Sequence, residues 1–144
     1  MVEILDETNR FPHVDALEHT VTGLLGELDL GDREVTLVLI DDPAMRTLNR
    51  MHRGIDDTTD VLSYPTAEPD DSGMPTVDHL GDIIISIDTA GRQATEHGHD
   101  LLSEILVLAA HGLTHLRGFD HPTEESWEIF RSTQQRILAL KPAI

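Results

Sequence analysis

The stretch from Asp100 to Gly118 constrains the fold of this chain more than any other segment. Its sequence, DLLSEILVLAAHGLTHLRG, predicts a helix that begins at Asp100 or Ser103 and stops at Gly118. Apolar residues occupy nearly every face of that helix, and such a helix belongs in the interior of a protein. We therefore predict a central buried helix, with the rest of the chain packed around it as one domain over residues 1–144.

The periodicity of apolar residues predicts the remaining elements. Segments 2–7, 33–40, 60–65 and 80–88 are predicted as strands, and segments 13–28, 43–52, 88–97 and 124–140 as further helices. Asp42 is the expected N-cap of the second helix, because Pro43 suits a first helical position. The polar residues 66–79 are predicted as a loop. The fold class is α+β (mixed α/β), with a mixed sheet of about four strands and about five helices.

Composition limits the classes of protein that remain. The chain has no cysteine, so any metal must be held by His, Asp or Glu. It shows no signal-like opening and no apolar run long enough to cross a bilayer, which predicts a cytoplasmic protein without a membrane partner. The formal net charge of -17 argues against broad nucleic-acid affinity. Arg46, Arg50 and Arg53 form a local basic cluster, and on spacing alone a solvated helix face is the favoured interpretation.

Three histidines point to a metal site at the end of the apolar helix. His111 and His115 are four residues apart, so their side chains project from one helix face and can share an ion. Gly118 allows a sharp turn, after which His121 can return to the same point. Neutral imidazoles suit zinc, while copper, nickel and iron stay open. Three protein ligands leave a position for water, as in hydrolytic zinc sites, and we interpret Asp120 as a turn residue or a support for the ligands rather than a fourth ligand.

The residue after the first histidine is Gly112, where a zinc peptidase with this spacing carries a glutamate base. A phosphodiester substrate needs such a base less, because its own oxygens can accept protons and an arginine can meet the developing charge. Glu104 lies roughly 10 Å along the helix axis from His111, which suits a supporting role better than that of a base. The other histidines, including His97 and His99, are predicted to be surface groups.

The segment HGLTHLRGFDH resembles the HGxLHLxGYDH signature of the YbeY family, which comprises bacterial endoribonucleases and ribosomal-RNA maturation factors. Two further segments are similar to family motifs in the same order. LNRMHRGIDDTTDVLSYP resembles LNxxYRGxDxPTDVLSFP, and LGDIIISIDTA resembles the LGDIxIS strand. The three motifs cover much of residues 48–121.

The resemblance implies that His111, His115 and His121 bind one zinc ion per chain. It also implies that Arg53 contacts a phosphate near that metal. The function it implies is single-strand-specific endoribonuclease activity in the 3′-end maturation of 16S rRNA and in ribosome quality control. The expected partners are single-stranded RNA, small-subunit ribosomal RNA and the ribosome, and no DNA is expected. Asp60, Ser63 and Asp82 occupy motif positions, and we interpret them as structural residues.

Two alternatives stay open at the level of the sequence. One is a zinc peptidase or another metal hydrolase, against which the missing glutamate speaks. The other is a non-catalytic ribosome-assembly factor whose zinc is structural and whose contribution is binding.

Overall fold

The computed structural model describes residues 1–66, 79–119 and 124–143. Along the chain the elements are β1 (Val2–Asp6), α1 (Val14–Glu27), β2 (Glu34–Ile40), α2 (Asp42–Arg53), β3 (Val61–Pro65), β4 (His79–Ser86), α3 (Ile87–His97), α4 (Leu101–Leu116) and α5 (Glu124–Leu140). The predicted α+β class is confirmed, including its mixed sheet and the central helix. Both boundaries of β4 were wrong, because His79 belongs to the strand rather than to the preceding loop, and Ile87 and Asp88 belong to α3 rather than to the strand.

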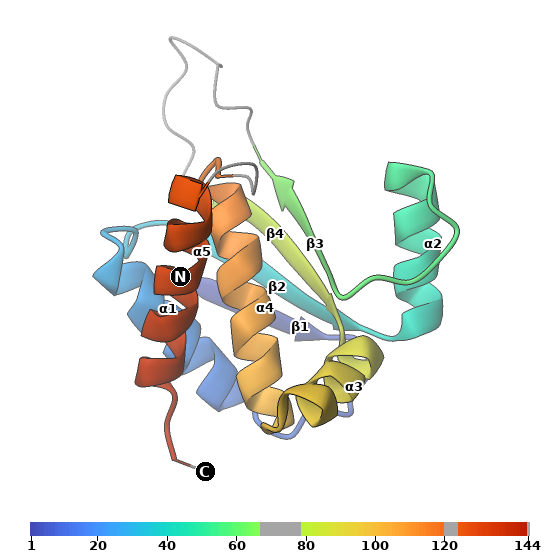
Figure 1. Cartoon of the computed structure of the whole chain (residues 1–144), viewed down its shortest axis with the longest axis horizontal. Helices are drawn as coiled ribbons and strands as arrows, with labels where there is room; N and C mark the ends of the chain where they lie inside the picture. Colours follow the sequence, from blue (N-terminus) through green and yellow to red (C-terminus); the bar gives the residue numbers. More distant parts are fainter. Residues whose placement is uncertain (67–78, 120–123, 144) are drawn as a thin grey trace, which may run out of the picture.

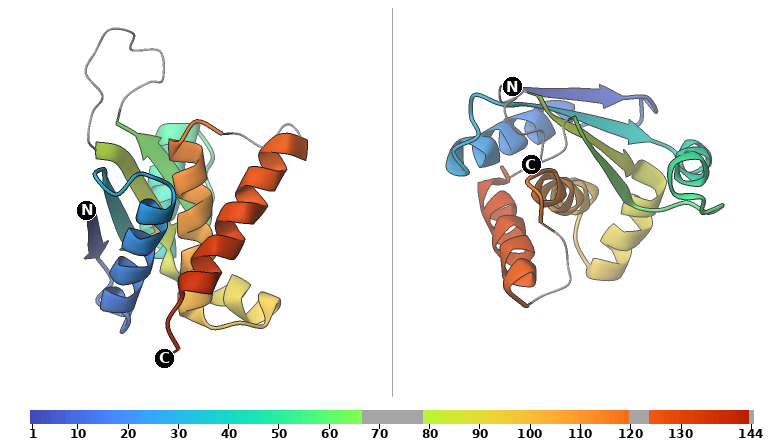
Figure 2. Two further views of the ribbon diagram at one scale, coloured as in Figure 1. Left: turned by 90° about the vertical axis from the view of Figure 1, so that its left-hand side faces the viewer. Right: turned by 90° about the horizontal axis from the view of Figure 1, so that it is seen from above.

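The four strands form one mixed sheet in the order β1-β2-β4-β3. The pairs β1–β2 and β2–β4 are parallel, whereas β3 runs antiparallel to β4. Helices α1, α4 and α5 cover one face of this sheet, and α2 lies at the end away from α1 (Figures 1 and 2). In Figure 1 the C-terminal ends of α2 and α4 point towards the same end of the molecule, and β3 runs between these two helices.

Helix α4 is the centre of the core, as its composition predicted. It contacts β3 and β4 on one side and α1, α3 and α5 on the others. Its buried apolar residues pack with leucines of α1 and with the inward-facing residues of β2 and β4. The largest fully buried side chains are Leu17, Leu24, Leu25, Leu37, Leu39, Met45, Ile83, Ile85, Leu102, Ile105, Leu106 and Leu113. The two histidines of α4 therefore belong to a helix that packs against strands and helices on several sides.

The predicted N-cap of α2 was displaced by one residue. Asp41 caps the helix by accepting a hydrogen bond from the backbone N–H of Ala44, at 2.9 Å. Asp42 instead accepts hydrogen bonds from the hydroxyls of Ser86 and Thr89, at 2.5 and 2.7 Å, and forms an ion pair with Arg92 at 2.9 Å. This carboxylate joins the starts of α2 and α3 at the end of β4.

We expect Asp42→Asn to lower the free energy of unfolding by about 1–2 kcal/mol at neutral pH. Partial burial alone would raise the pKa of Asp42, but the hydrogen bonds from Ser86, Thr89 and Arg92 lower it to about 2. Because the pKa is depressed in the folded state, the stabilisation is complete above about pH 4 and is lost as the pH falls towards 2. Urea unfolding of both proteins between pH 7 and pH 2 measures this difference.

Asp32→Asn is the matched control, because the Asp32 side chain is 84% exposed and the expected change is within about 0.5 kcal/mol. A difference between wild type and Asp42→Asn that stays constant over this pH range would contradict the role of the ionised Asp42.

Candidate active site

His111 and His115 lie one helical turn apart in the C-terminal half of α4, and both are half-buried. Their ring centroids are 4.9 Å apart. The buried ring of Phe130 from α5 contacts both imidazoles, with centroid distances of 4.7 and 5.0 Å. Helix periodicity therefore brings the two predicted ligands together, and an aromatic wall limits the directions in which their rings can turn.

A cavity of about 460 Å³ opens in front of this histidine pair. Its walls come from the C-terminal end of α2, the segment that leads into β3, the first half of β3, and α4. It is lined by Arg53, Thr59, Asp60, Val61, Leu62, Ser63, His111 and His115. The structure thus brings Arg53 together with two of the three predicted zinc ligands, although they are more than fifty residues apart in sequence. His121 and Asp120 lie outside the described residues.

Arg53 is the last residue of α2, and the turn that follows it is well defined. Gly54 adopts a left-handed conformation with φ of 71°. The Asn49 side chain donates to the backbone carbonyl of Asp57 at 2.9 Å, which fixes the loop beyond the glycine. Burial raises the pKa of Tyr64, and the positive charge of Arg53 opposes that rise. The charge of the Arg53 guanidinium therefore acts on Tyr64 near the end of β3, beside the cavity.

The three arginines of the basic cluster have different surroundings. Arg46 makes a bidentate pair with Asp56, with distances of 2.9 and 3.1 Å, and Arg50 lies 3.9 Å from the same carboxylate. For these two exposed side chains the interpretation as a solvated face fits. Within the described residues Arg53 forms no ion pair with an acidic side chain, so its charge is available to the cavity.

Asp60 and Ser63 line the cavity while holding the local backbone. The Asp60 carboxylate accepts from the backbone N–H of Val61 at 2.7 Å and from the Gln93 side-chain amide at 3.2 Å. The Ser63 hydroxyl donates to the carbonyl of Gly112 at 3.3 Å. Asp82 is not part of the cavity lining; it lies 3.6 Å from the His79 ring on β4. The structural interpretation of these three residues stays a prediction.

The packing of Gly112 explains why no glutamate follows the first histidine. A Cβ atom at this position would lie 2.7 Å from Cγ2 of Ile83 and 3.0 Å from the Ser63 hydroxyl oxygen. Ile83 is fully buried in β4, so it has no room to withdraw. Helix α4 approaches the sheet here more closely than any side chain at position 112 would allow. The site therefore lacks the base of a zinc peptidase for a steric reason.

A second group of metal-ligating side chains was not expected from the sequence. The ligand atoms of His97, His99 and Glu104 all lie within 4.8 Å of one another, so this group could hold a metal ion. His97 is exposed, as predicted, but His99 is only partly exposed and both rings contact Glu104. The pattern HxH followed by a glutamate five residues later was the available signal.

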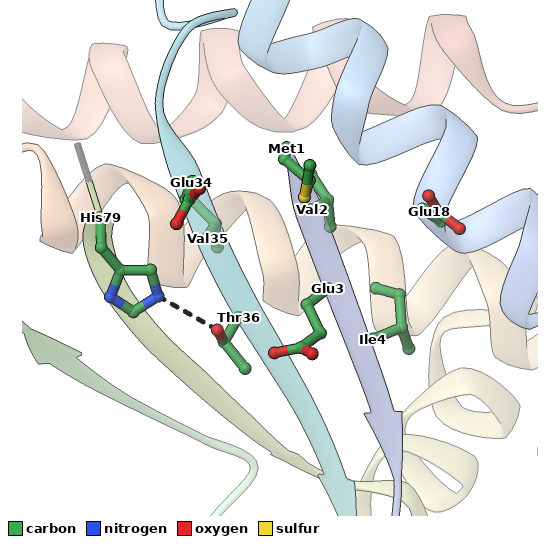
Figure 3. A pocket seen from close by; sticks show the side chains of 9 residues that line it. All are labelled: Met1, Val2, Glu3, Ile4, Glu18, Glu34, Val35, Thr36 and His79. Atoms are coloured by element: carbon green, nitrogen blue, oxygen red, sulfur yellow. Dashed lines mark hydrogen bonds between the residues drawn. The ribbon is translucent and has the colours of Figure 1, made fainter.

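Another cavity, of about 570 Å³, lies beside the starts of β1 and β2 (Figure 3). Its polar lining includes Glu3, Glu18 and Glu34, and His79, whose ring is hydrogen-bonded to Thr36 at 3.0 Å. The three carboxylates come from separate positions and do not converge on a common point in Figure 3. This cavity offers no counterpart to the paired histidines of the first.

The described residues form an α+β domain whose central helix presents paired imidazoles beside an arginine. The family model described as "Endoribonuclease YbeY" matches residues 4–141. This chain therefore belongs to the endoribonuclease YbeY family, and the predicted membership of an endoribonuclease family is confirmed.

Individual relatives agree with this assignment. A protein from Thermus thermophilus named Endoribonuclease YbeY is 51% identical over 142 residues, covering 97% of this chain and 100% of that protein. A protein of the same name from Deinococcus radiodurans is 48% identical over 126 residues, covering 80% of each chain. A solution structure of a Thermotoga maritima protein superposes with a TM-score of 0.67 at 25% identity, covering 96% of this chain and 90% of that one.

Across the described ranges 1–66, 79–119 and 124–143, no helix has both the length and the apolar character needed to cross a membrane.

Proposed function

We propose that this chain is a zinc-dependent endoribonuclease that cuts single-stranded RNA, as one metal-dependent hydrolase domain over residues 1–144. Its biological role would be the 3′-end maturation of 16S rRNA and ribosome quality control in the cytoplasm, with the ribosome as partner. The observation that carries this proposal is the shared cavity, which Arg53 lines together with His111 and His115. Family membership supports the RNA substrate.

The donor set fits zinc. His111 and His115 would supply two imidazole nitrogens, and His121 is the proposed third ligand, which lies outside the described residues. No thiolate competes, because the chain has no cysteine. Zinc in this position would supply Lewis-acid chemistry and lower the pKa of a water molecule to about 7. Phe130 helps this chemistry by holding both rings from the side of α5.

Arg53 would bind the scissile phosphate and stabilise the negative charge that grows on it in the transition state. A planar guanidinium at the rim of the cavity can contact two phosphate oxygens at once. Since Arg46 and Arg50 are held by Asp56, Arg53 is the member of the cluster that faces the substrate. The net charge of -17 would confine RNA binding to the neighbourhood of this cavity.

The same packing argues against the peptidase alternative. A peptidase base would have to occupy position 112, where even a methyl group meets Ile83. Asp60 lines the cavity, but both of its carboxylate oxygens already accept hydrogen bonds from Val61 and Gln93. A phosphodiester, which carries its own proton-accepting oxygens, suits a cavity built in this way.

We expect Arg53→Ala to reduce cleavage of a single-stranded RNA by about 10²–10³-fold while zinc content stays at the wild-type level. The loss follows because a transition-state charge would lose its cationic partner. Arg46→Ala is the matched control: it removes an arginine from the same helix, and only an exposed ion pair is lost. The measurement is the initial rate of RNA cleavage on protein with determined metal content.

An Arg53→Ala protein that cleaves RNA as fast as the Arg46→Ala protein would overturn the role of Arg53. A different result would favour the non-catalytic assembly factor. In that result no preparation, wild type included, cleaves RNA, and the Arg53→Ala protein binds ribosomes poorly.

A further inference from the structure

His97, His99 and Glu104 meet where α3 ends and α4 begins. His97 is the last residue of α3, Gly98 ends that helix in a left-handed conformation with φ of 71°, and Asp100 caps α4. In Figure 1 this junction lies at the opposite end of α4 from the end that follows His115. The cluster is therefore separate from the cavity that contains Arg53.

The geometry of the cluster centres on one carboxylate oxygen. Nδ1 of His97 lies 2.8 Å from Oε1 of Glu104, and Nε2 of His99 lies 2.6 Å from the same oxygen. The two rings stand edge to face, with centroids 5.7 Å apart. The Glu104 side chain is 1% exposed, whereas the His97 side chain is 56% exposed. A buried carboxylate thus forms the floor of a site that opens to solvent through His97.

A buried carboxylate is costly unless cationic or hydrogen-bonding groups compensate it. Both imidazoles lie within hydrogen-bonding distance of the buried Glu104 carboxylate, and its negative charge attracts a metal cation placed between the ligands. The overall charge of -17 adds to the attraction of any cation.

The ligand atoms have the right kind and spacing for a divalent transition metal. Two imidazole nitrogens and one carboxylate oxygen form a donor set that zinc, nickel and iron accept. Metal–ligand bonds of about 2.0–2.2 Å place tetrahedral ligand atoms roughly 3.3 Å apart. The two nitrogen–oxygen separations in the cluster are 2.8 and 2.6 Å, and all three ligand atoms lie within 4.8 Å of one another. Binding an ion would widen the two nitrogen–oxygen separations by about 0.5–0.7 Å, which small rotations of the His97 and His99 rings can supply.

The backbone around the cluster is firmly held, which favours a preformed site. The Asp100 carboxylate accepts from the backbone N–H of Ser103 at 2.8 Å and from Lys141 at 3.1 Å. The hydrogen bond from the backbone N–H of Ser103 is the main reason that the pKa of Asp100 falls to about 2. Glu104 itself belongs to the first turn of the buried helix α4. The ligands therefore project from a fixed helix junction.

We propose that His97, His99 and Glu104 form a second site for a divalent transition metal such as Zn²⁺, distinct from the site at His111 and His115. The remaining coordination positions face solvent and take water. The ion connects His97 at the end of α3 to Glu104 at the start of α4, so its binding stabilises the folded chain. Zinc binding at this second site does not require RNA cleavage, so it can be measured without an activity assay.

The test uses the full chain with Zn²⁺ alone as the probe, in a His115→Ala background that disables the other proposed site. Metal-free protein is titrated with ZnCl₂ by calorimetry, and bound zinc is counted after dialysis. We expect His115→Ala to bind about one ion and to gain several degrees in Tm, as binding to the folded state alone requires. Adding His97→Ala, which alters an exposed side chain, is expected to weaken that binding at least about 10-fold.

His115→Ala combined with His19→Ala is the matched control, because His19 is exposed and belongs to α1, outside the cluster. A second ligand variant, with His99→Ala in place of His97→Ala, is expected to show the same loss. The proposal is overturned if the His115→Ala protein binds no zinc. It is equally overturned if its binding is unchanged by both His97→Ala and His99→Ala. Neither result would bear on RNA cleavage by the wild type.

Discussion

Gly112→Glu is expected to lower the free energy of unfolding by more than about 4 kcal/mol and to create no peptidase activity. The substitution would restore the glutamate found after the first histidine of a zinc peptidase, but it would place that side chain between α4 and the sheet. Its Cβ alone would lie 2.7 Å from Ile83, a residue with no exposed surface. The carboxylate would add an unpaired charge to the same packed interface.

Gly112→Ala separates the steric part of this effect from the charge. Alanine stabilises a helix interior by up to about 1 kcal/mol relative to glycine, so a residue with free space around it should gain stability. At position 112 overpacking costs about 1–3 kcal/mol, and we expect a net loss. Gly91→Ala in α3 is the matched control, because nothing lies within 4 Å of a Cβ built at that position.

Urea unfolding of the variants gives the free energies directly. A Gly112→Ala protein that gains as much stability as Gly91→Ala would show that α4 can move away from the sheet. In that case the lack of a glutamate would no longer follow from packing.

Much of the fold could be predicted because local patterns and tertiary packing agree. Helix α4 is apolar on nearly every side, and the structure places it at the centre of the core. Boundaries were less certain where two adjacent residues compete for one role. Both Asp41 and Asp42 can cap a helix, and the bonds that Asp42 makes to Ser86 and Thr89, more than forty residues away, decided the outcome.

The candidate site was predictable to the extent that it depends on helix spacing. His111 and His115 share a face because they are four residues apart, whereas the closeness of Arg53 depends on how α2 and β3 are placed around α4. For Arg53 the family motifs supplied what spacing alone could not. The steric role of Gly112 depends on the distance between a helix and a sheet, which no local pattern contains.

The cluster of His97, His99 and Glu104 escaped prediction for a similar reason. His97 ends one helix and Glu104 belongs to the next, so no single period relates them. The left-handed turn at Gly98 reverses the chain and aims both imidazoles at the glutamate. The burial of Glu104, which makes the cluster chemically significant, follows from the packing of α4 in the core.

His115→Ala is expected to reduce RNA cleavage at least roughly 10³-fold, the largest loss of activity among the variants considered. Removing one imidazole from the pair on α4 would leave two of the proposed ligands, too few to hold zinc firmly. Because His115 also contacts the Phe130 ring, the His115→Asn protein serves as a second, polar variant that leaves less empty space beside that ring. Circular dichroism and Tm show whether each variant is folded.

We propose that a metal ion held by the histidines in the C-terminal half of α4 enables this chain to cut RNA. Zinc content and cleavage of a single-stranded RNA, measured on the same preparations of wild type, His115→Ala and the His19→Ala control, test it most directly. We expect wild type and His19→Ala to cleave RNA, and folded His115→Ala to lose both cleavage and the zinc bound beside His111. A folded His115→Ala protein that cleaves RNA within a few-fold of wild type would contradict the claim.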